Sequence, residues 1–156
     1  MNNRGFTLIE ILVVLLIIGI SMGFALMAFG DFGEKRRIIV AAEQFINVVK
    51  LVQQQAVLET STLAIDVHDN HYEVLRFKPP ASWSPMSTRS IFHRQHAVTG
   101  LVISLKNKTQ NPSVIINSSG DMTPFTLDFG TSTQPSLATI VGANNGTITL
   151  HTAASP

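Results

Sequence analysis

An apolar run near the N-terminus limits the folds open to this chain more than any other feature. From Ile11 to Gly30, roughly twenty consecutive residues are uncharged and most are apolar. At a rise of about 1.5 Å per residue, a helix of this length spans the hydrocarbon core of a bilayer, about 30 Å thick. A cleavable secretory signal has a shorter apolar segment followed by a small-residue cleavage site, which Ser21 to Gly23 and Ala25 to Ala28 match only loosely. The run therefore predicts a retained transmembrane helix over residues 6–30.

The rest of the composition fits an anchored protein with one modest domain. The chain has 156 residues, which suffices for a single core beside an anchor. Only 13% of the residues are charged, against about a quarter in soluble domains, so much of the surface is expected to meet lipid or protein. The net charge of +1 disfavours a nucleic-acid partner, and the absence of cysteine excludes disulfides and thiolate chemistry.

Glu10 is the one charged residue within the apolar segment of residues 6–30. A carboxylate in hydrocarbon costs several kcal/mol unless it is paired or protonated. If the chain were cut between Gly5 and Phe6, the new α-amino group would lie four residues from Glu10, one helical turn away. It could then pair with that carboxylate or with the carboxylate of a neighbouring copy. The alternative is that Glu10 simply sits at the headgroup boundary.

The residues around Glu10 carry a family resemblance. The stretch Arg4-Gly5-Phe6-Thr7-Leu8-Ile9-Glu10-Ile11-Leu12-Val13-Val14 resembles the cleavage and methylation motif of type IV pilins and type II secretion pseudopilins. The resemblance implies that a prepilin peptidase removes residues 1–5 by cutting after Gly5. It also implies that Phe6 becomes an N-methylated N-terminus and that Glu10 aids subunit docking.

The charges that flank the apolar run do not settle the orientation of the helix. Arg4 precedes the run, but Lys35, Arg36 and Arg37 follow it, so the positive-inside rule gives no clear answer. The orientation implied by the resemblance places the C-terminal domain in the periplasm. The downstream basic cluster is interpreted as a solvated helix face, with lipid headgroups or a neighbouring subunit as alternative contacts.

Residues 31–60 have the apolar periodicity of a helix that continues beyond the membrane. Gly30 and Gly33 are candidate points of bending at the junction. Polar residues fill the other faces of the helix, as an amphipathic helix requires. The predicted buried stripe comprises Ile38, Ala42, Phe45, Ile46, Val49, Val52 and Ala56.

From residue 61 to residue 156 the apolar period changes to two, which is typical of β-strands. Asp69-Asn70 and Asn144-Asn145-Gly146 are hairpin signals, and residues 78–90 are expected to form an irregular loop. The fold class is therefore α+β, with a long N-terminal helix packed on a mainly antiparallel β-sheet domain. The resemblance implies that this is the pseudopilin fold. The expected strands are Leu63 to Val67, Tyr72 to Phe77, Leu101 to Leu105, Val114 to Ile116, Phe125 to Phe129, Leu137 to Val141 and Thr147 to Leu150.

A second motif narrows the resemblance. Ser118-Ser119-Gly120-Asp121-Met122-Thr123-Pro124-Phe125-Thr126-Leu127 resembles a stretch of the H-type minor pseudopilins of type II secretion. The helix end at Gln53 to Ala56 and the segment Gly142 to Leu150 also resemble that family. The direct physical role of the Gly120-Asp121 segment is expected to be a turn that leads into a strand.

No catalytic, cofactor or metal site is predicted. His68 and His71 flank the Asp69-Asn70 turn, and His93 and His96 are three residues apart, but a zinc site generally needs three or four protein ligands. Asp66, Asp69 and Asn70 lack the spacing of a calcium loop, Gly142 to Gly146 is not a phosphate loop, and no nucleophile elbow occurs.

Two features of the middle segment invite a partner hypothesis. Trp83 is interpreted as a side chain that pins the loop onto the sheet, with an interface anchor as the alternative. The mildly basic stretch of Arg89, His93, Arg94 and His96 has little aromatic interleaving, which disfavours nucleic acid.

The resemblance predicts a minor pseudopilin of a type II secretion system, at or near the tip of the periplasmic pseudopilus, that helps to export folded proteins. Its location would be the bacterial inner membrane, crossed once. Its partners would be the other minor pseudopilins, the major pseudopilin, the prepilin peptidase and the inner-membrane assembly platform. The alternatives are a minor type IV pilin acting in pilus assembly, adhesion or DNA uptake, and a membrane-tethered hydrolase, for which no constellation is found.

Overall fold

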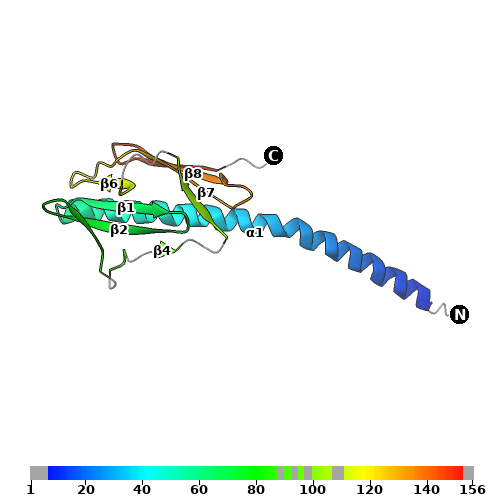
Figure 1. Ribbon diagram of the computed structural model, residues 1–156. Coiled ribbons are helices and arrows are strands. Elements are labelled where there is room, and N and C mark those ends of the chain that lie inside the picture. The colour runs from blue at the N-terminus through cyan, green and yellow to red at the C-terminus, as the bar shows by residue number, and fades with distance from the viewer. Residues whose placement is uncertain (1–6, 88–89, 93–94, 97–99, 107–110, 153–156) are drawn as a thin grey trace. The chain divides into compact units, whose positions relative to one another are not determined.

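One long helix precedes nine strands in the computed structural model, which describes residues 7–87, 90–92, 95–96, 100–106 and 111–152 (Figure 1). Side chains are described within these ranges except at residues 26–32 and 95–96. The helix α1 runs from Leu8 to Leu58 without interruption, so the backbone stays helical through Gly30 and Gly33. The chain divides into two compact units between Arg36 and Arg37, and α1 contributes to both.

The second half of α1 buries the stripe that the periodicity predicts. Phe45, Val49 and Val52 have no exposed surface, and Ile46 alone in the predicted set is only partly buried. The other buried members of the stripe are Ile38, Ala42 and Ala56. The amphipathic interpretation of this segment is confirmed.

The helix α1 ends in a turn whose amides donate hydrogen bonds to two carbonyl groups of the last helical residues. Ser61 N donates to Ala56 O at 3.0 Å, and Thr60 N donates to Val57 O at 3.2 Å. This pattern requires a left-handed residue just beyond the helix, a position that glycine usually fills. Here the residue is Thr60, with φ of 48°.

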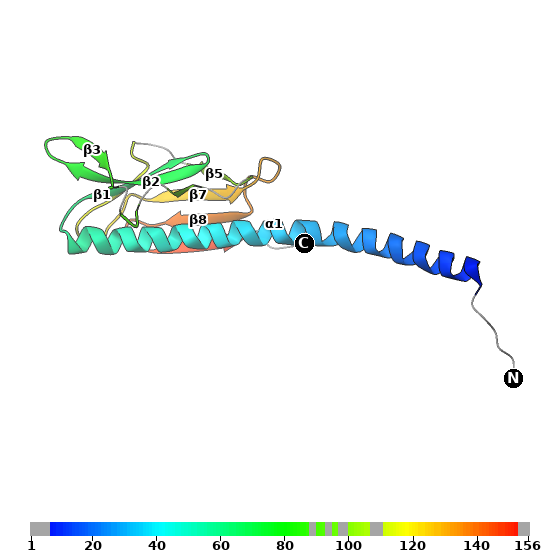
Figure 2. The same cartoon turned by 90° about the horizontal axis from the view of Figure 1, so that it is seen from below.

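Two antiparallel sheets follow the helix. In the first, the order is β3-β2-β1-β6, with β4 also paired to β2. In the second, the order is β5-β7-β8-β9 (Figures 1 and 2). The first sheet contains β1 (Leu63–His68), β2 (His71–Lys78), β3 (Ser82–Pro85), β4 (Gln95–His96) and β6 (Val114–Ile116); the second contains β5 (Val102–Leu105), β7 (Phe125–Gly130), β8 (Ala138–Gly142) and β9 (Ile148–Thr152).

Phe45 of α1 joins the helix to both sheets. Its ring meets Tyr72 of β2 edge-on, with ring centroids 4.9 Å apart. It also lies 6.3 Å from the ring of Phe125 and 5.7 Å from that of Phe129, both on β7. The helix and the two sheets therefore share one hydrophobic core.

The loop predicted over residues 78–90 is only partly irregular. Ser82 to Pro85 form β3, which pairs with β2 in the register Phe77↔Trp83. The rings of Phe77 and Trp83 pack edge-on at 5.3 Å, which confirms that Trp83 holds this segment on the sheet. The prolines misled the prediction because an edge strand tolerates proline at its ends, and Pro85 is the last residue of β3. The two-residue β4 was also missed.

Candidate functional site on the long helix

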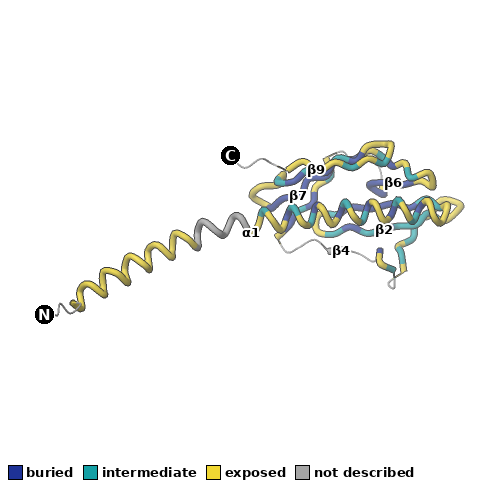
Figure 3. The backbone as a smooth tube through the Cα atoms, turned by 180° about the vertical axis from the view of Figure 1, so that it is seen from behind, coloured by how far each residue is buried: buried dark blue, intermediate teal, exposed yellow. Residues whose placement is uncertain are grey.

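The first half of α1 is apolar and exposed on every side. Residues 8–25 have a mean hydropathy of 2.6 and no buried residue (Figure 3). By length and composition, this is the one helix of the described chain that suffices to cross a membrane. In water, an uncovered apolar surface of this length is strongly unfavourable, so lipid or neighbouring protein must cover it.

Glu10 lies in the first turn of this exposed segment. Its amide donates to Thr7 O at 3.1 Å, and the amide of Ile11 donates to the same oxygen at 3.4 Å. An acidic residue in the first turn is favoured by the helix dipole, and threonine three residues before glutamate is a helix-start signal that sequence reasoning overlooked. The Glu10 side chain is exposed, while Gly5 and Phe6 lie outside the described residues.

The H-type motif forms a tight turn between β6 and β7. Asn117 N donates to Asp121 O, and Gly120 N donates to Asn117 O, both at 3.0 Å. The Ser119 hydroxyl donates to Asn117 Oδ1 or to Asp121 Oδ2, at 2.8 and 2.7 Å. Gly120 has φ of 88°, a conformation that glycine adopts without strain. The motif is thus a structural turn, as predicted.

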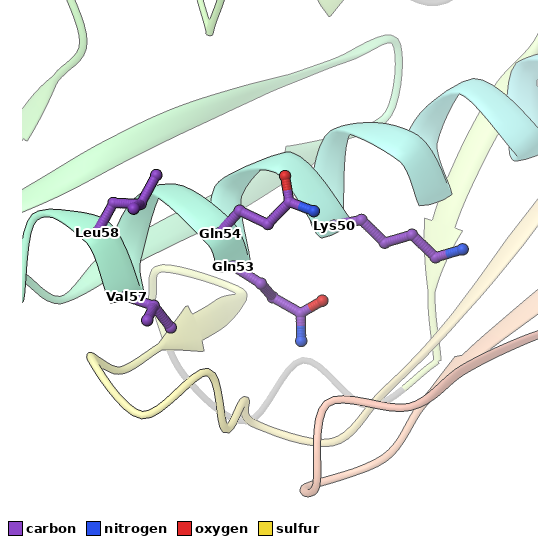
Figure 4. A pocket seen from close by; sticks show the side chains of 5 residues that line it. All are labelled: Lys50, Gln53, Gln54, Val57 and Leu58. Carbon is purple, nitrogen blue, oxygen red and sulfur yellow. The ribbon is translucent and has the colours of Figure 1, made fainter.

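Gln53 of α1 holds this turn and the β8–β9 hairpin together. Its side-chain amide donates to Gly120 O at 3.1 Å and to Gly146 O at 3.2 Å. Met122 N donates to Asn144 O at 3.0 Å, which links the two turns directly. Figure 4 shows Gln53 pointing from the helix towards these turns. Sequence reasoning noted the glutamine run without finding this contact, because it depends on residues far along the chain.

An open groove runs beside this contact on the last turns of α1. It is lined by Lys50, Gln53, Gln54, Val57 and Leu58 (Figure 4). Leu58 is 80% exposed and Val57 is 49% exposed. Lys50 is the one titratable residue of the five, so the groove holds no acid–base pair for catalysis. Its composition suits contact with a protein better than chemistry on a small molecule.

Two ion pairs each join residues far apart in the sequence, and both lower the pKa of a carboxyl group. Burial raises the pKa of Asp128, but hydrogen bonds from Lys106 and Thr139 and the Lys106 charge outweigh it, so the pKa falls below 3.8. Lys106 Nζ lies 2.9 Å from Asp128 Oδ2. The pKa of Glu59 is lowered first by the hydrogen bond from Gln55, and also by Arg76, which forms an ion pair with it.

The histidines of the β1–β2 hairpin meet as the sequence suggested they could. His68 and His71 are directly opposite in register, and their rings stack at 4.4 Å. His68 also adjoins the carboxylates of Asp66 and Glu73. Of the other pair considered, His93 lies outside the described residues and the side chain of His96 is not described.

Comparison with known proteins identifies the family of this chain. The model of the prokaryotic N-terminal methylation motif matches residues 1–26, and the model described as type II transport protein GspH matches residues 41–151. The chain belongs to the GspH family. The GspH match includes the H-type turn and the Gln53 contact, and the methylation-motif match includes Gly5, Phe6 and Glu10.

Relatives and solved structures agree with this assignment. The type II secretion system protein H of Pseudomonas aeruginosa is 30% identical over 142 residues, covering 80% of this chain and 81% of the relative. The protein of that name from Klebsiella pneumoniae is 27% identical, covering 83% and 88%. The structure of the minor pseudopilin EpsH from the type 2 secretion system of Vibrio cholerae matches with a TM-score of 0.64 at 19% identity, covering 74% of this chain and 97% of that one. This GspH-family chain therefore has the pseudopilin fold.

Proposed function

We propose that this GspH-family chain is a minor pseudopilin, a structural subunit at or near the tip of the periplasmic pseudopilus of a type II secretion system. The observation that carries the proposal is the fully exposed apolar segment Leu8–Ala25, continuous in one helix with a stripe that anchors a folded domain. Such a helix serves first as a membrane anchor and then as a surface that neighbouring subunits cover. The work of the protein is assembly that supports export of folded proteins, and it is not an enzyme.

The proposal includes processing at the N-terminus. A prepilin peptidase cuts after Gly5, and Phe6 becomes the N-methylated first residue. The anchor at residues 6–30 crosses the inner membrane once, and the β-rich domain, residues 61–156, lies in the periplasm. The methylation-motif match over residues 1–26 supports this placement.

Glu10 carries the docking role in this proposal. As the acidic residue of an otherwise apolar exposed segment, it needs a positive partner once lipid or protein covers the helix. The amine created at Phe6, on the same chain or on a neighbour, has the matching charge. The other minor pseudopilins, the major pseudopilin and the inner-membrane assembly platform are the partners that this surface would meet.

Replacement of Glu10 tests the docking role. Glu10→Ala in the native host is expected to impair pseudopilus assembly and secretion of exported proteins together, with the chain still present in the membrane. Glu43→Ala is the matched control, because Glu43 is exposed on the same helix beyond the apolar segment. Assembly unchanged in the Glu10 variant would contradict the role.

Mass spectrometry of the mature chain tests the processing. The expected N-terminus is methylated Phe6, and deletion of the prepilin peptidase should leave Met1 to Gly5 attached. Cleavage between Ser21 and Ala28 would show a removable signal instead.

Two further assays test the alternative functions. Turnover of a hydrolase substrate by the purified chain would contradict the structural role. Affinity for DNA that falls as the salt concentration rises would favour an uptake pilin.

A further inference from the structure

Two carboxylates and a histidine converge on the outward face of the β1–β2 hairpin. Asp66 of β1 lies directly opposite Glu73 of β2, and His68 follows Asp66 by two residues. Residues two apart on a strand share a face, as do residues directly opposite each other. The core lies behind the other face, which carries Ile65, Val67, Tyr72 and Val74.

The three side chains bring their ligand atoms to a common point. His68 Nε2 lies 3.3 Å from Asp66 Oδ2 and 3.9 Å from Glu73 Oε1. The three ligand atoms all lie within 4.8 Å of one another. Ligands about 2.1 Å from a tetrahedral zinc ion are about 3.4 Å apart, so the first edge already fits and the others need small side-chain rotations.

The nitrogen at the centre of this group, His68 Nε2, lacks a hydrogen-bond partner. His68 Nε2 is itself buried, although the His68 side chain is 40% exposed, and it has no partner in hydrogen-bonding geometry. Asp66 and Glu73 lie directly opposite each other in the strand pair, and like charges in that position repel. A divalent cation bound here would give the nitrogen a partner and offset the repulsion between the carboxylates.

The segment that precedes β6 fixes the Asp66 side chain by hydrogen bonds. The Ser113 hydroxyl donates to Asp66 Oδ1 at 2.9 Å, and the Ser113 amide donates to the same oxygen at 3.3 Å. The other oxygen, Oδ2, is the one that faces His68. A carboxylate fixed through one oxygen while the second points into the cluster is the usual arrangement around a bound metal.

We propose that Asp66, His68 and Glu73 form a binding site for one divalent transition-metal ion of the zinc type. The imidazole ligand selects against magnesium and calcium, which prefer oxygen ligands throughout. Three protein ligands leave one position of a tetrahedral ion for water. The side chains of Asp66, Glu73 and His68 are 10%, 24% and 40% exposed, so the site is open on the solvent side.

Isothermal titration of the full-length chain in detergent micelles with zinc chloride tests the site. Saturable binding of one zinc ion per chain is expected, with a rise in the unfolding temperature. His68→Gln and Glu73→Gln should each weaken binding at least tenfold and abolish the thermal shift. Their unfolding temperatures without metal show whether each variant is folded. Magnesium chloride should not displace the zinc.

Control variants separate this site from the other histidines. His151→Gln removes an exposed histidine of β9, and His93→Gln removes one of the second pair considered from the sequence; both should bind zinc as the unaltered chain does. The proposal fails if the unaltered chain shows no saturable binding at millimolar zinc. It fails equally if both His68→Gln and Glu73→Gln retain full affinity, or if either control loses binding.

Discussion

Truncation of Phe45 should remove a large part of the stability of the domain. Phe45 has no exposed surface, and its ring contacts aromatic rings of both sheets. A buried phenylalanine covers about 150–250 Å², which at about 25 cal/mol per Å² corresponds to about 4–6 kcal/mol, an upper bound for the transfer free energy. Phenylalanine-to-alanine changes in cores cost about 3–5 kcal/mol, cavity included. We therefore expect Phe45→Ala to lower the free energy of unfolding by about 4 kcal/mol.

Urea unfolding of the full-length chain in mild detergent measures this loss. The fluorescence of Trp83, the single tryptophan, reports on the β2–β3 hairpin, where its ring packs against Phe77. With a urea dependence of about 2 kcal/mol per molar, the midpoint should fall by about 2 M. The matched control is Phe24→Ala on the same helix, because Phe24 is 71% exposed. A loss below about 1 kcal/mol in Phe45→Ala, or one no larger than in the control, would refute the shared core.

The remaining predictions concern two backbone turns and one ion pair. Gly146→Ala should lower the free energy of unfolding by about 2 kcal/mol, because φ is 83° and the new Cβ would lie 2.7 Å from Gln53 Nε2. A double-mutant cycle with Gln53→Ala, measured by urea unfolding, tests the contact. If the effects of the two changes simply add, the contact is contradicted. Thr60→Gly should instead stabilise by about 1 kcal/mol in the same assay, since Thr60 has φ of 48° beyond the helix, and a loss of stability would count against the strain. For Asp128, the folded pKa lies below 3.8, so its stabilisation is present above that pH and is lost as the pH falls through the folded value. The unfolding temperature of Asp128→Asn should thus be lower than that of the unaltered chain at neutral pH, and this difference should shrink in acid. A difference that stays the same at every pH would show that the Lys106 ion pair is not its source.

Local patterns predicted most of the secondary structure because each depends on neighbours in sequence. The stripe from Ile38 to Ala56 follows from the helical period, and the β1–β2 hairpin follows from alternation around Asp69-Asn70. The helix end at Thr60 was less visible, because threonine gives no sign that it adopts a left-handed conformation. The strand β3 was missed because proline-rich segments are interpreted as loops.

The sites that join distant segments could not be predicted in the same way. Gln53 contacts Gly120 and Gly146, and nothing near Gln53 in the sequence indicates either partner. The cluster of Asp66, His68 and Glu73 is different, because it lies within the predicted hairpin: the two-residue turn pairs Asp66 with Glu73, and sequence reasoning weighed Asp66 and His68 without adding Glu73. The methylation motif at Gly5 and Phe6 was recognised directly, because its residues are contiguous and the match is to sequence itself.

The Gln53 contact also orders the events of folding. Its two hydrogen bonds span 67 and 93 residues of chain, so neither can form until most of the domain has been synthesised. Helices form in about a microsecond, and α1 is made first, so its apolar stripe waits without a partner while the strands emerge. Closure of so long a loop costs entropy that only the completed sheets repay. During that interval the uncovered apolar stripe of the helix is prone to aggregation, and a partner that covers it early would protect the nascent subunit.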